Sequence, residues 1–316
     1  MKIALGIDIG GTNTAFGFID QEGNTLAEAK IPTSNHKEIN DYINELAEAI
    51  NSTFEPLREK HQLIGIGVGA PNANFHRGTI EHAANLLWKG VIPFVELLSK
   101  HFNLPIFINN DANTAAIGEM VYGSAKNMKN FIAITLGTGL GSGIVVNGQM
   151  QYGYLGTAGE LGHIIITHNG RLCGCGRRGC LETYVSATGL TTTAKEILET
   201  SKEQSILRSL PLDDLNSKNI YKAALENDKL AKEIFNHTAQ ILGLALANYV
   251  AIANPEAIFL NGGLAKAGDL IFKPTYKAME ENMLHIFKGK TQLLCSGIEG
   301  NAAILGASAM VWKKEQ

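Results

Sequence analysis

The 316-residue sequence has few cysteines, no excess of either charge and no long apolar segment. Four cysteines are present, and nothing else in the chain indicates an oxidising compartment. Lysine and arginine number 27 against 30 acidic residues, which gives a net charge of −3. A chain with this balance lacks the basic footprint that nucleic-acid binding requires, so DNA and RNA are not expected partners.

The absence of long apolar runs argues against secretion and against membrane insertion. The start, MKIALGIDIGG, has one lysine, but Asp8 interrupts its apolar residues and no small-residue cleavage site follows. The most apolar later run, at 241–260, contains Asn248, Asn254, Pro255 and Glu256, which would be costly in hydrocarbon. We therefore expect a cytoplasmic protein that makes no membrane contact.

The length and the order of periodic segments predict two α/β domains. Chains of this size usually exceed a single core. Apolar positions at helical spacing in residues 36–60 precede the buried strand LIGIGVGAPN, and residues 94–102 and 105–109 repeat the helix and strand order. A long helix over 233–252, the strand AIFLN and a last helix over about 301–313 follow. Residues 184–235 read as polar helices, with a connection at 205–217, and show no recognisable chemistry.

Three of the four cysteines fall in one glycine-rich stretch, GELGHIIITHNGRLCGCGRRGCLET, at 159–183. With the nearby histidine they supply the ligands of a closed tetrahedral zinc site, namely His163, Cys173, Cys175 and Cys180. A disulfide and unconnected reduced thiols are the alternatives. A bridge between Cys173 and Cys175 would be strained, which favours the metal.

Two carboxylates bracket this loop. Glu160 lies three residues before the histidine, and Glu182 lies two residues after the last cysteine. Carboxylates accept paired hydrogen bonds from neighbouring hydroxyl groups, so a loop fixed by a metal would turn both into candidate polyol ligands. Taken singly, each glutamate could equally be a solvated surface residue.

A strand, a polar glycine turn and a second strand occur twice. The first copy is KIALGI–DIGGTN–TAFGFID and the second is FIAITL–GTGLGS–GIVVNG, which aligns Gly10 with Gly137. Backbone N–H groups in such turns form a nest for anions, and Thr12 and Thr138 can add hydroxyl donors. One copy alone could be a simple hairpin. Two matched copies indicate duplicated domains that face each other.

The cysteine stretch resembles the signature EXGHX9CXCGXXGCXE of the ROK family of repressors, open reading frames and sugar kinases. Every fixed position is met, by Glu160, Gly162, His163, Cys173, Cys175, Gly176, Gly179, Cys180 and Glu182. The two glycine turns resemble the phosphate loops of the actin, Hsp70 and hexokinase superfamily. The resemblance implies an α/β fold of the actin/Hsp70/hexokinase (ribonuclease H-like) type, with an interdomain cleft and a zinc-stapled loop. Residues 1–113 plus a C-terminal helix at about 301–316 would form one domain, and residues 114–300 the larger one.

Asp111 follows the strand PIFIN and precedes an expected helix, NTAAIGEMVYG. From the local sequence it could simply cap that helix. The segment INNDANTAAIGE is similar, however, to the ROK segment whose aspartate is the catalytic base. The resemblance therefore implies that Asp111 accepts the proton of an attacking sugar hydroxyl.

The family likeness implies the remaining site residues. Sugar ligands would be Asn85, Asn110, Asp111, Glu160, His163 and Glu182. Asp8 would lie near Mg²⁺ through its waters, and ATP would be held by Gly10, Gly11, Thr12, Asn13, Thr138 and Gly139, with adenosine at Gly262 and Gly263. Asn72 also matches a family position near the sugar. The zinc would be structural, with one ring nitrogen of His163 on the metal and the other on the sugar.

These resemblances predict an ATP-dependent hexose kinase, and the segment GAPNANFHRGTIEHAANLLWKG is most similar to glucokinase-type members. Conversion of glucose to glucose 6-phosphate is the expected reaction, with an N-acetylmannosamine, N-acetylglucosamine or fructose kinase as the alternative. Family repressors carry a DNA-binding domain before the first phosphate loop, for which residue 8 leaves no room. A sugar sensor without catalysis is disfavoured by Asp8, Gly11, Thr12, Thr138 and Asp111. Dimers are common in the family, so a homodimer is expected.

Overall fold

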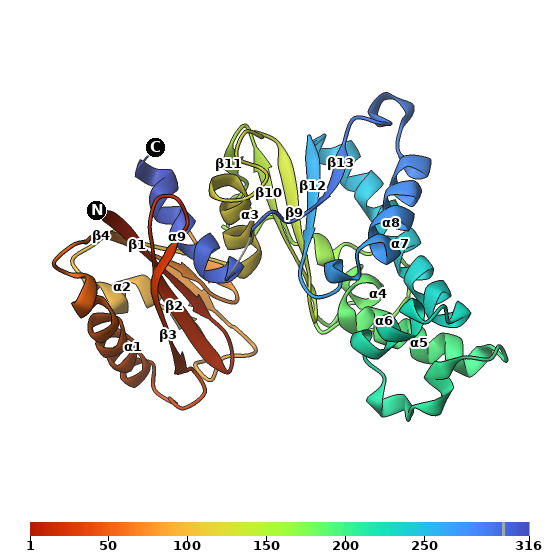
Figure 1. The fold of residues 1–316 in the computed structure, drawn as a ribbon, viewed down its shortest axis with the longest axis horizontal. Helices are drawn as coiled ribbons and strands as arrows, with labels where there is room; N and C mark the ends of the chain where they lie inside the picture. The colour runs from red at the N-terminus through yellow and green to blue at the C-terminus, as the bar shows by residue number, and fades with distance from the viewer. Residues whose placement is uncertain (299–300, 316) are drawn as a thin grey trace.

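The computed structural model describes residues 1–298 and 301–315, which form two lobes, each built on a five-stranded sheet (Figure 1). The first sheet has the order β3-β2-β1-β4-β8. Its strands are β1 Lys2–Ile9, β2 Asn13–Ile19, β3 Thr25–Pro32, β4 Gln62–Gly69 and β8 Ile106–Asn109. A small sheet of β5 Ala73–Asn74, β6 Thr79–Glu81 and β7 Val91–Ile92 lies between β4 and β8 in the chain.

The second sheet repeats the first, with the order β11-β10-β9-β12-β13. It consists of β9 Phe131–Leu136, β10 Leu140–Val146, β11 Gln149–Met150, β12 Ala257–Asn261 and β13 Gln292–Cys295. Strand β1 pairs antiparallel with β2 and parallel with β4, and β9 pairs in the same way with β10 and β12. The glycine turns lie at the same point of the two sheets. The expected duplication is thus confirmed.

Helices cover the outer faces of both sheets and lie between them. The first lobe contains α1 Ile39–Phe54 and α2 Phe94–Ser99. Helix α3, Asp111–Val121, follows β8, the last strand of the first sheet. The second lobe contains α4 Glu182–Val185, α5 Ala187–Thr200, α6 Ser217–Leu225, α7 Lys229–Ala253 and α8 Asp269–Asn282, and α9 Ala302–Glu315 follows. The predicted helix over 36–60 is shorter, because Pro56 lies in a separate 3₁₀ turn, Glu55–Leu57. No helix in these described stretches is long and apolar enough to cross a bilayer.

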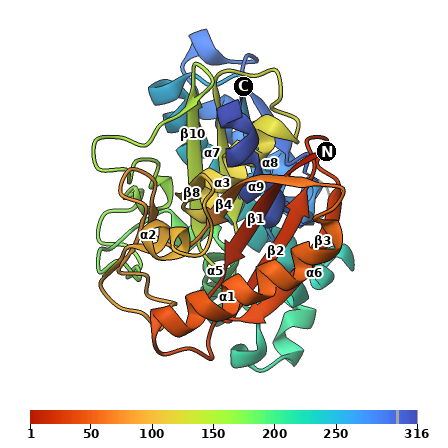
Figure 2. The same ribbon diagram turned by 90° about the vertical axis from the view of Figure 1, so that its left-hand side faces the viewer.

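Alternation along β1 explains how its two faces are covered. Ile3, Leu5 and Ile7 pack with α1 in one core cluster, whereas Ala4 and Gly6 face α9. Figure 2 shows α1 on one side of the first sheet and α9 on the other. The strand β9 alternates in the same way, with one face in the α5–α7 core and the other toward α3.

The two lobes exchange their last helices. α3 follows the first sheet but packs on β9 and β10, and α9 follows the second sheet but packs on β1 and β4. A Cβ at Gly67 would overlap the carbonyl oxygen of Ala307, and a Cβ at Gly143 would lie 2.7 Å from Cβ of Ala116. α3 and α9 cross where Gly118 meets Gly306. The last helix thus packs on the sheet of the first lobe, and glycine makes the close approach possible.

The expected domain boundary after residue 113 falls inside α3, the helix that joins the first sheet to the second. The expected C-terminal helix begins at Ala302, and its last predicted residue, Gln316, lies outside the described residues. The helix predicted over 233–252 begins earlier, at Lys229, because Asp228 caps it.

Candidate functional site

Asn110 and Asp111 occupy the junction between β8 and α3. The Oδ1 atom of Asn110 accepts the N–H of Asn113 at 2.8 Å, so Asn110 is the N-cap and Asp111 is the first helical residue. The capping alternative for Asp111 was therefore wrong, and the helix starts two residues before the predicted NTAAIGEMVYG segment. Because the cap is supplied by its neighbour, the Asp111 carboxylate can serve another function.

The environment of Asp111 makes its carboxylate a proton acceptor near neutral pH. The Asp111 residue is exposed to the cleft on one side. On its other sides, protein atoms take the place of water. This burial, together with the negative charge of Asp8, raises the pKa of Asp111 to about 7. Burial also raises the pKa of Asp8. Two carboxylates with raised pKa values are typical of a site that binds a cation or transfers a proton.

Each glycine turn is closed by a backbone hydrogen bond, which spans four residues in the first turn and three in the second. The N–H of Gly10 donates to the carbonyl of Asn13 at 3.0 Å, and the N–H of Gly137 donates to Gly139 at 3.0 Å. Next to the first turn, the carbonyl oxygen of Asn85 would lie 2.6 Å from a Cβ at Gly11. Asn85 thus lies against the first turn and does not line the main cavity.

The four predicted zinc ligands come together. Their ligand atoms lie within 4.8 Å of one another, with Sγ of Cys175 and Cys180 3.6 Å apart and Sγ of Cys173 3.7 Å from Nδ1 of His163. Zn–S bonds of about 2.3 Å in a tetrahedron would separate two thiolates by roughly 3.8 Å, so the donor set fits Zn²⁺. Hydrogen bonds from Arg177 lower the pKa of Cys175 to about 6, toward the thiolate that binds metal.

The loop around these ligands folds back tightly. Isolated antiparallel bridges join Ile165 to Cys180 and Leu172 to Arg178. Gly179, with φ of 82°, lies where a Cβ would overlap the carbonyl oxygen of Thr167. Glycine is required here for both conformation and space. No disulfide joins the cysteines of the described chain.

His163 and Glu182 connect the cysteine cluster to the cavity. Nδ1 of His163 faces the thiols, which leaves Nε2 for another partner. The Oε2 atom of Glu182 accepts the N–H of Leu140 at 2.9 Å, and Oε1 lies 3.6 Å from Sγ of Cys173. Glu182 therefore joins the cysteine loop to the second glycine turn, a contact that the sequence did not predict.

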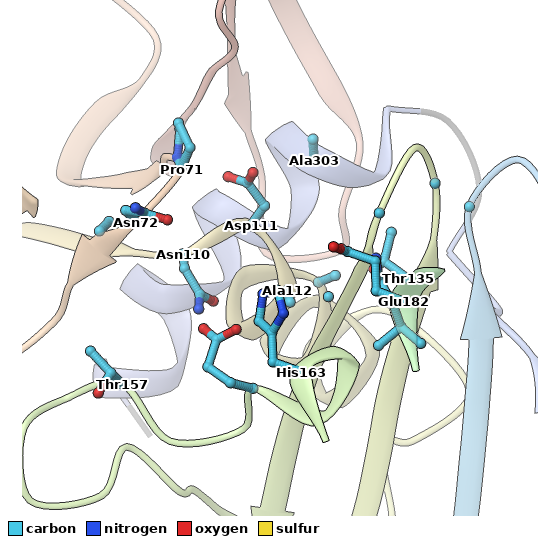
Figure 3. Close-up of a pocket in the computed structure, with 18 of the residues that line it drawn as sticks. Pro71, Asn72, Asn110, Asp111, Ala112, Thr135, Thr157, His163, Glu182 and Ala303 are labelled. Carbon is cyan, nitrogen blue, oxygen red and sulfur yellow. The ribbon is translucent and has the colours of Figure 1, made fainter. Parts of the chain in front are cut away.

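The main cavity, of about 1030 Å³, lies between the lobes. Side chains from α3, the cysteine loop and the second sheet surround it (Figure 3). It collects much of the predicted site, namely Asn110, Asp111, Gly139, Glu160, His163, Cys175, Glu182 and Gly262, as well as Asn72. The lining does not include Asp8, Gly10, Gly11, Thr12, Asn13, Asn85, Thr138, Gly263, Cys173 and Cys180.

Some cavity residues were not predicted. Thr135 and Asn261 are paired neighbours at the carboxyl ends of β9 and β12, and both line the cavity. The Oδ1 atom of Asn261 is buried with no hydrogen-bond partner in the described chain, so it can accept a ligand donor. The glycine alignment that places Gly137 opposite Gly10 also places Thr135 opposite Asp8, and this signal could have identified Thr135.

A second cavity, of about 370 Å³, opens beside Thr138. It is lined by hydroxyl, amide and ammonium groups of α5 and the start of α6, including Thr188, Thr191, Lys195 and Asn216. The N–H of Ala187 donates to the carbonyl of Gly137 at 2.8 Å and so fixes α5 against the second glycine turn. The segment that showed no chemistry in the sequence therefore forms a polar pocket beside a candidate phosphate loop.

Comparisons with known proteins agree with this geometry. The profile of the ROK family matches residues 4–314. A glucokinase from Halalkalibacterium halodurans is 36% identical over 98% of this chain and 95% of its own length, and one from Streptomyces coelicolor is 34% identical over 98% and 97%. The crystal structure of a ROK family glucokinase from Streptomyces griseus in complex with glucose and AMPPNP is 31% identical, with a TM-score of 0.79 over 98% of this chain and 99% of that one.

Proposed function

The chain belongs to the ROK family, and from this premise we propose that it transfers the terminal phosphoryl group of ATP to glucose. It is a sugar kinase. The observation that carries the proposal is one cavity in which a carboxylate with a pKa of about 7 lies beside a glycine turn and the histidine of a cysteine cluster. Because the curated relatives are named glucokinase, we propose glucose and not another hexose as the substrate.

Asp111 is the proposed base. At neutral pH about half of its carboxylates are ionised and can accept the proton of the attacking sugar hydroxyl. In a loose phosphoryl-transfer transition state this proton leaves late, so the orientation of the hydroxyl matters as much as the basicity of the acceptor. The cap at Asn110 fixes the start of α3 and so places the Asp111 carboxylate that would receive this proton.

The remaining sugar hydroxyls are assigned to Asn110, which precedes Asp111 in the same turn, and to three residues of the cysteine loop that line the same cavity, Glu160, His163 and Glu182. Glu182 keeps one oxygen on the N–H of Leu140 and offers the other. We keep Asn85 as a ligand that would reach the sugar only when the lobes close, because it now lies beside Gly11.

The nucleotide is assigned to the two glycine turns, with Asp8, Gly10, Gly11, Thr12, Asn13, Thr138 and Gly139 around its phosphates. Backbone N–H groups of these turns would bind phosphate oxygens. Asp8 would hold Mg²⁺, which screens the phosphate charge when bound. Adenosine would extend from Gly262 and Gly263 to the polar cavity beside Thr138.

The cysteine cluster is assigned to structural zinc. Four protein ligands leave no open position for chemistry, so the ion contributes rigidity. His163, Glu182 and Glu160 belong to the same folded loop, and fixing its turn fixes all three. We also retain the division into residues 1–113 with the C-terminal helix and 114–300, and the homodimer, as proposals that limited proteolysis and light scattering can test.

The experiment is an ATP-dependent coupled assay on glucose, fructose, mannose, allose, N-acetylglucosamine and N-acetylmannosamine, with Asp111→Asn in parallel. Turnover of glucose with the highest kcat/KM supports the proposal. Preferential turnover of an N-acetylhexosamine or fructose would keep the kinase and replace the sugar. Glucose binding without turnover of any sugar would reject the kinase in favour of a sensor.

A further inference from the structure

Tyr152 forms a contact between the lobes. It follows β11 in the second lobe, whereas Phe75 lies between β5 and β6 in the first. Their rings stack with centroids 4.4 Å apart and planes within 2°, and His76 meets the Tyr152 ring edge-on at 5.5 Å. Such stacking fixes the ring and thereby the position of its hydroxyl group.

The Tyr152 hydroxyl reaches the strand that carries the proposed base. Nδ2 of Asn109, the last residue of β8, donates to the Tyr152 oxygen at 3.0 Å. Oδ1 of Asn109 accepts the N–H of Asn110 and Nδ2 of Asn113, each at 3.1 Å. Asn109 is fully buried, so its hydrogen bonds do not compete with solvent. This amide therefore joins Tyr152 to both sides of the turn at Asn110 and Asp111.

The segment after Tyr152 is held by the first lobe at a second point. Nδ2 of Asn74 donates to the carbonyl of Leu155 at 2.9 Å, and Gly156 packs directly on the Asn74 amide. The same segment then supplies Thr157 and Glu160 to the cavity. Residues 152–160 thus run from the turn that bears Asp111 to a proposed sugar ligand.

We infer that Tyr152 is a positioning residue for phosphoryl transfer: through Asn109 its hydroxyl fixes the β8–α3 turn that presents Asn110 and Asp111, and so couples that turn to the sugar-binding loop of the other lobe. This inference rests on the proposed kinase function. Burial raises the pKa of Tyr152 to about 12, so the hydroxyl stays neutral over the working pH range and acts by hydrogen bonding alone.

The test removes one oxygen atom. Tyr152→Phe keeps the ring stack but leaves the Asn109 amide without its acceptor, and we expect kcat for glucose to fall roughly tenfold with KM for ATP unchanged. Tyr122→Phe is the matched control. Burial also raises the pKa of Tyr122 to about 12, and its hydroxyl group forms a 3.3 Å hydrogen bond with Ser308. Neither residue lines the cavity. That variant should keep the wild-type kcat.

A double-mutant cycle separates positioning from a general loss of structure. If Tyr152 acts through Asp111, adding Tyr152→Phe to Asp111→Asn should cause little further loss, since the base is already gone. Independent, multiplicative losses would overturn the inference, as would a Tyr152→Phe kcat equal to that of the wild type. An equal kcat loss in Tyr122→Phe would also overturn it.

Wild-type turnover is measured first, so that failure of the proposed function is seen separately. If the wild type phosphorylates no sugar, the positioning inference is tested by NMR titration of the Asp111 carboxyl group. A changed Asp111 pKa in Tyr152→Phe but not in Tyr122→Phe would support it, and identical titrations in all three proteins would overturn it.

Discussion

The two sheets have one strand order but present different chemistry at the same edge. Asp8 at the end of β1 corresponds to Thr135 in β9, and Gly69 at the end of β4 corresponds to Asn261 in β12. The first sheet thus offers carboxylates, and the second offers hydroxyl and amide groups. A frame built twice does not fix function; the residues at the carboxyl ends of its strands do.

The segments inserted between matching strands differ as well. Between β3 and β4 the first half has α1, whereas between β11 and β12 the second half has the cysteine loop and α4 to α7. Between β4 and β8 the first half inserts the small sheet that carries Phe75. In our proposal, the inserted cysteine loop supplies most of the sugar ligands, and the glycine turns of the repeated frame bind the phosphates of the nucleotide.

The largest expected effect separates the two edges. Asp111→Asn in the first half should lower kcat by ~10²–10⁴-fold, because the proton acceptor is lost. Asn261→Ala in the second half should raise KM for ATP several-fold and leave kcat nearly unchanged, because Asn261 precedes the Gly262 and Gly263 turn proposed for adenosine and its free Oδ1 can accept only a binding contact. Steady-state kinetics of both variants checks this, and a larger kcat loss from Asn261→Ala would reverse our assignment of the two edges.

The cysteine loop exists only in the second half, and its removal should affect the sugar more than the nucleotide. Cys175→Ser should release zinc and raise KM for glucose by an order of magnitude or more, because the loop that fixes Glu160 and His163 loosens. Metal analysis and kinetics would measure both effects. Cys295→Ser, which changes an exposed thiol on β13, is the control and should keep its zinc. An unaltered glucose KM in zinc-free protein would contradict the structural role.

The exchanged helices allow a matched pair of stability measurements. Gly67→Ala pushes a methyl group into the backbone of α9 and should lower the free energy of unfolding by about 3 kcal/mol. Gly143→Ala meets the side chain of Ala116 at 2.7 Å and should cost about 1–2 kcal/mol. Gly137→Ala has open space around it and should cost less. Chemical denaturation gives the order, and a more stable Gly67→Ala would show that the α9 contact is loose.

The pH dependence isolates the carboxylate pair of the first half. With a pKa of about 7, Asp111 is protonated below neutrality, so kcat/KM should fall tenfold per unit as pH drops below about 7. Asp8→Asn removes a negative charge, which favours the ionised form of Asp111 and should move the midpoint to lower pH. If the pH midpoint of kcat/KM in Asp8→Asn stays in place or rises, the charge of Asp8 does not raise the pKa of Asp111.

The smallest effect concerns stability and pH. The pKa of Asp111 is higher in the folded chain than its ordinary value of 3.8, so the fold binds more protons than the unfolded chain between about pH 4 and 7. Its contribution to stability is therefore full below pH 4 and is lost as pH rises to 7. Relative to wild type, Asp111→Asn should be more stable at pH 8 than at pH 4, which thermal unfolding can measure.

The sequence predicted those parts of the site in which the ligands are close in the chain or repeated. His163, Cys173, Cys175 and Cys180 lie within one short loop, and the glycine turns occur twice, so their patterns are visible without a fold. Asp111 was harder, because an aspartate between a strand and a helix is an ordinary cap. Only the family resemblance singled it out, and the structure gives the cap to Asn110.

The remainder depends on contacts between distant segments. Tyr152 meets Asn109 across 43 positions, and Glu182 meets Leu140 across 42. Neither pair has a local pattern, since the first depends on how the lobes are placed and the second on how the cysteine loop folds onto its own sheet. The polar cavity beside Thr138 is formed by two helices whose separate sequences resemble ordinary solvated surfaces.

The exchange of α3 and α9 also has a consequence for biosynthesis. Strands β1 and β4 leave the ribosome long before α9, the helix that covers the face of these strands holding Gly6 and Gly67. At roughly 5–20 residues per second, the nascent first lobe waits on the order of ten to fifty seconds with that face uncovered. A chaperone that binds exposed apolar strands has this interval in which to act, and a ribosome that stalls before residue 302 holds a lobe that cannot complete its fold.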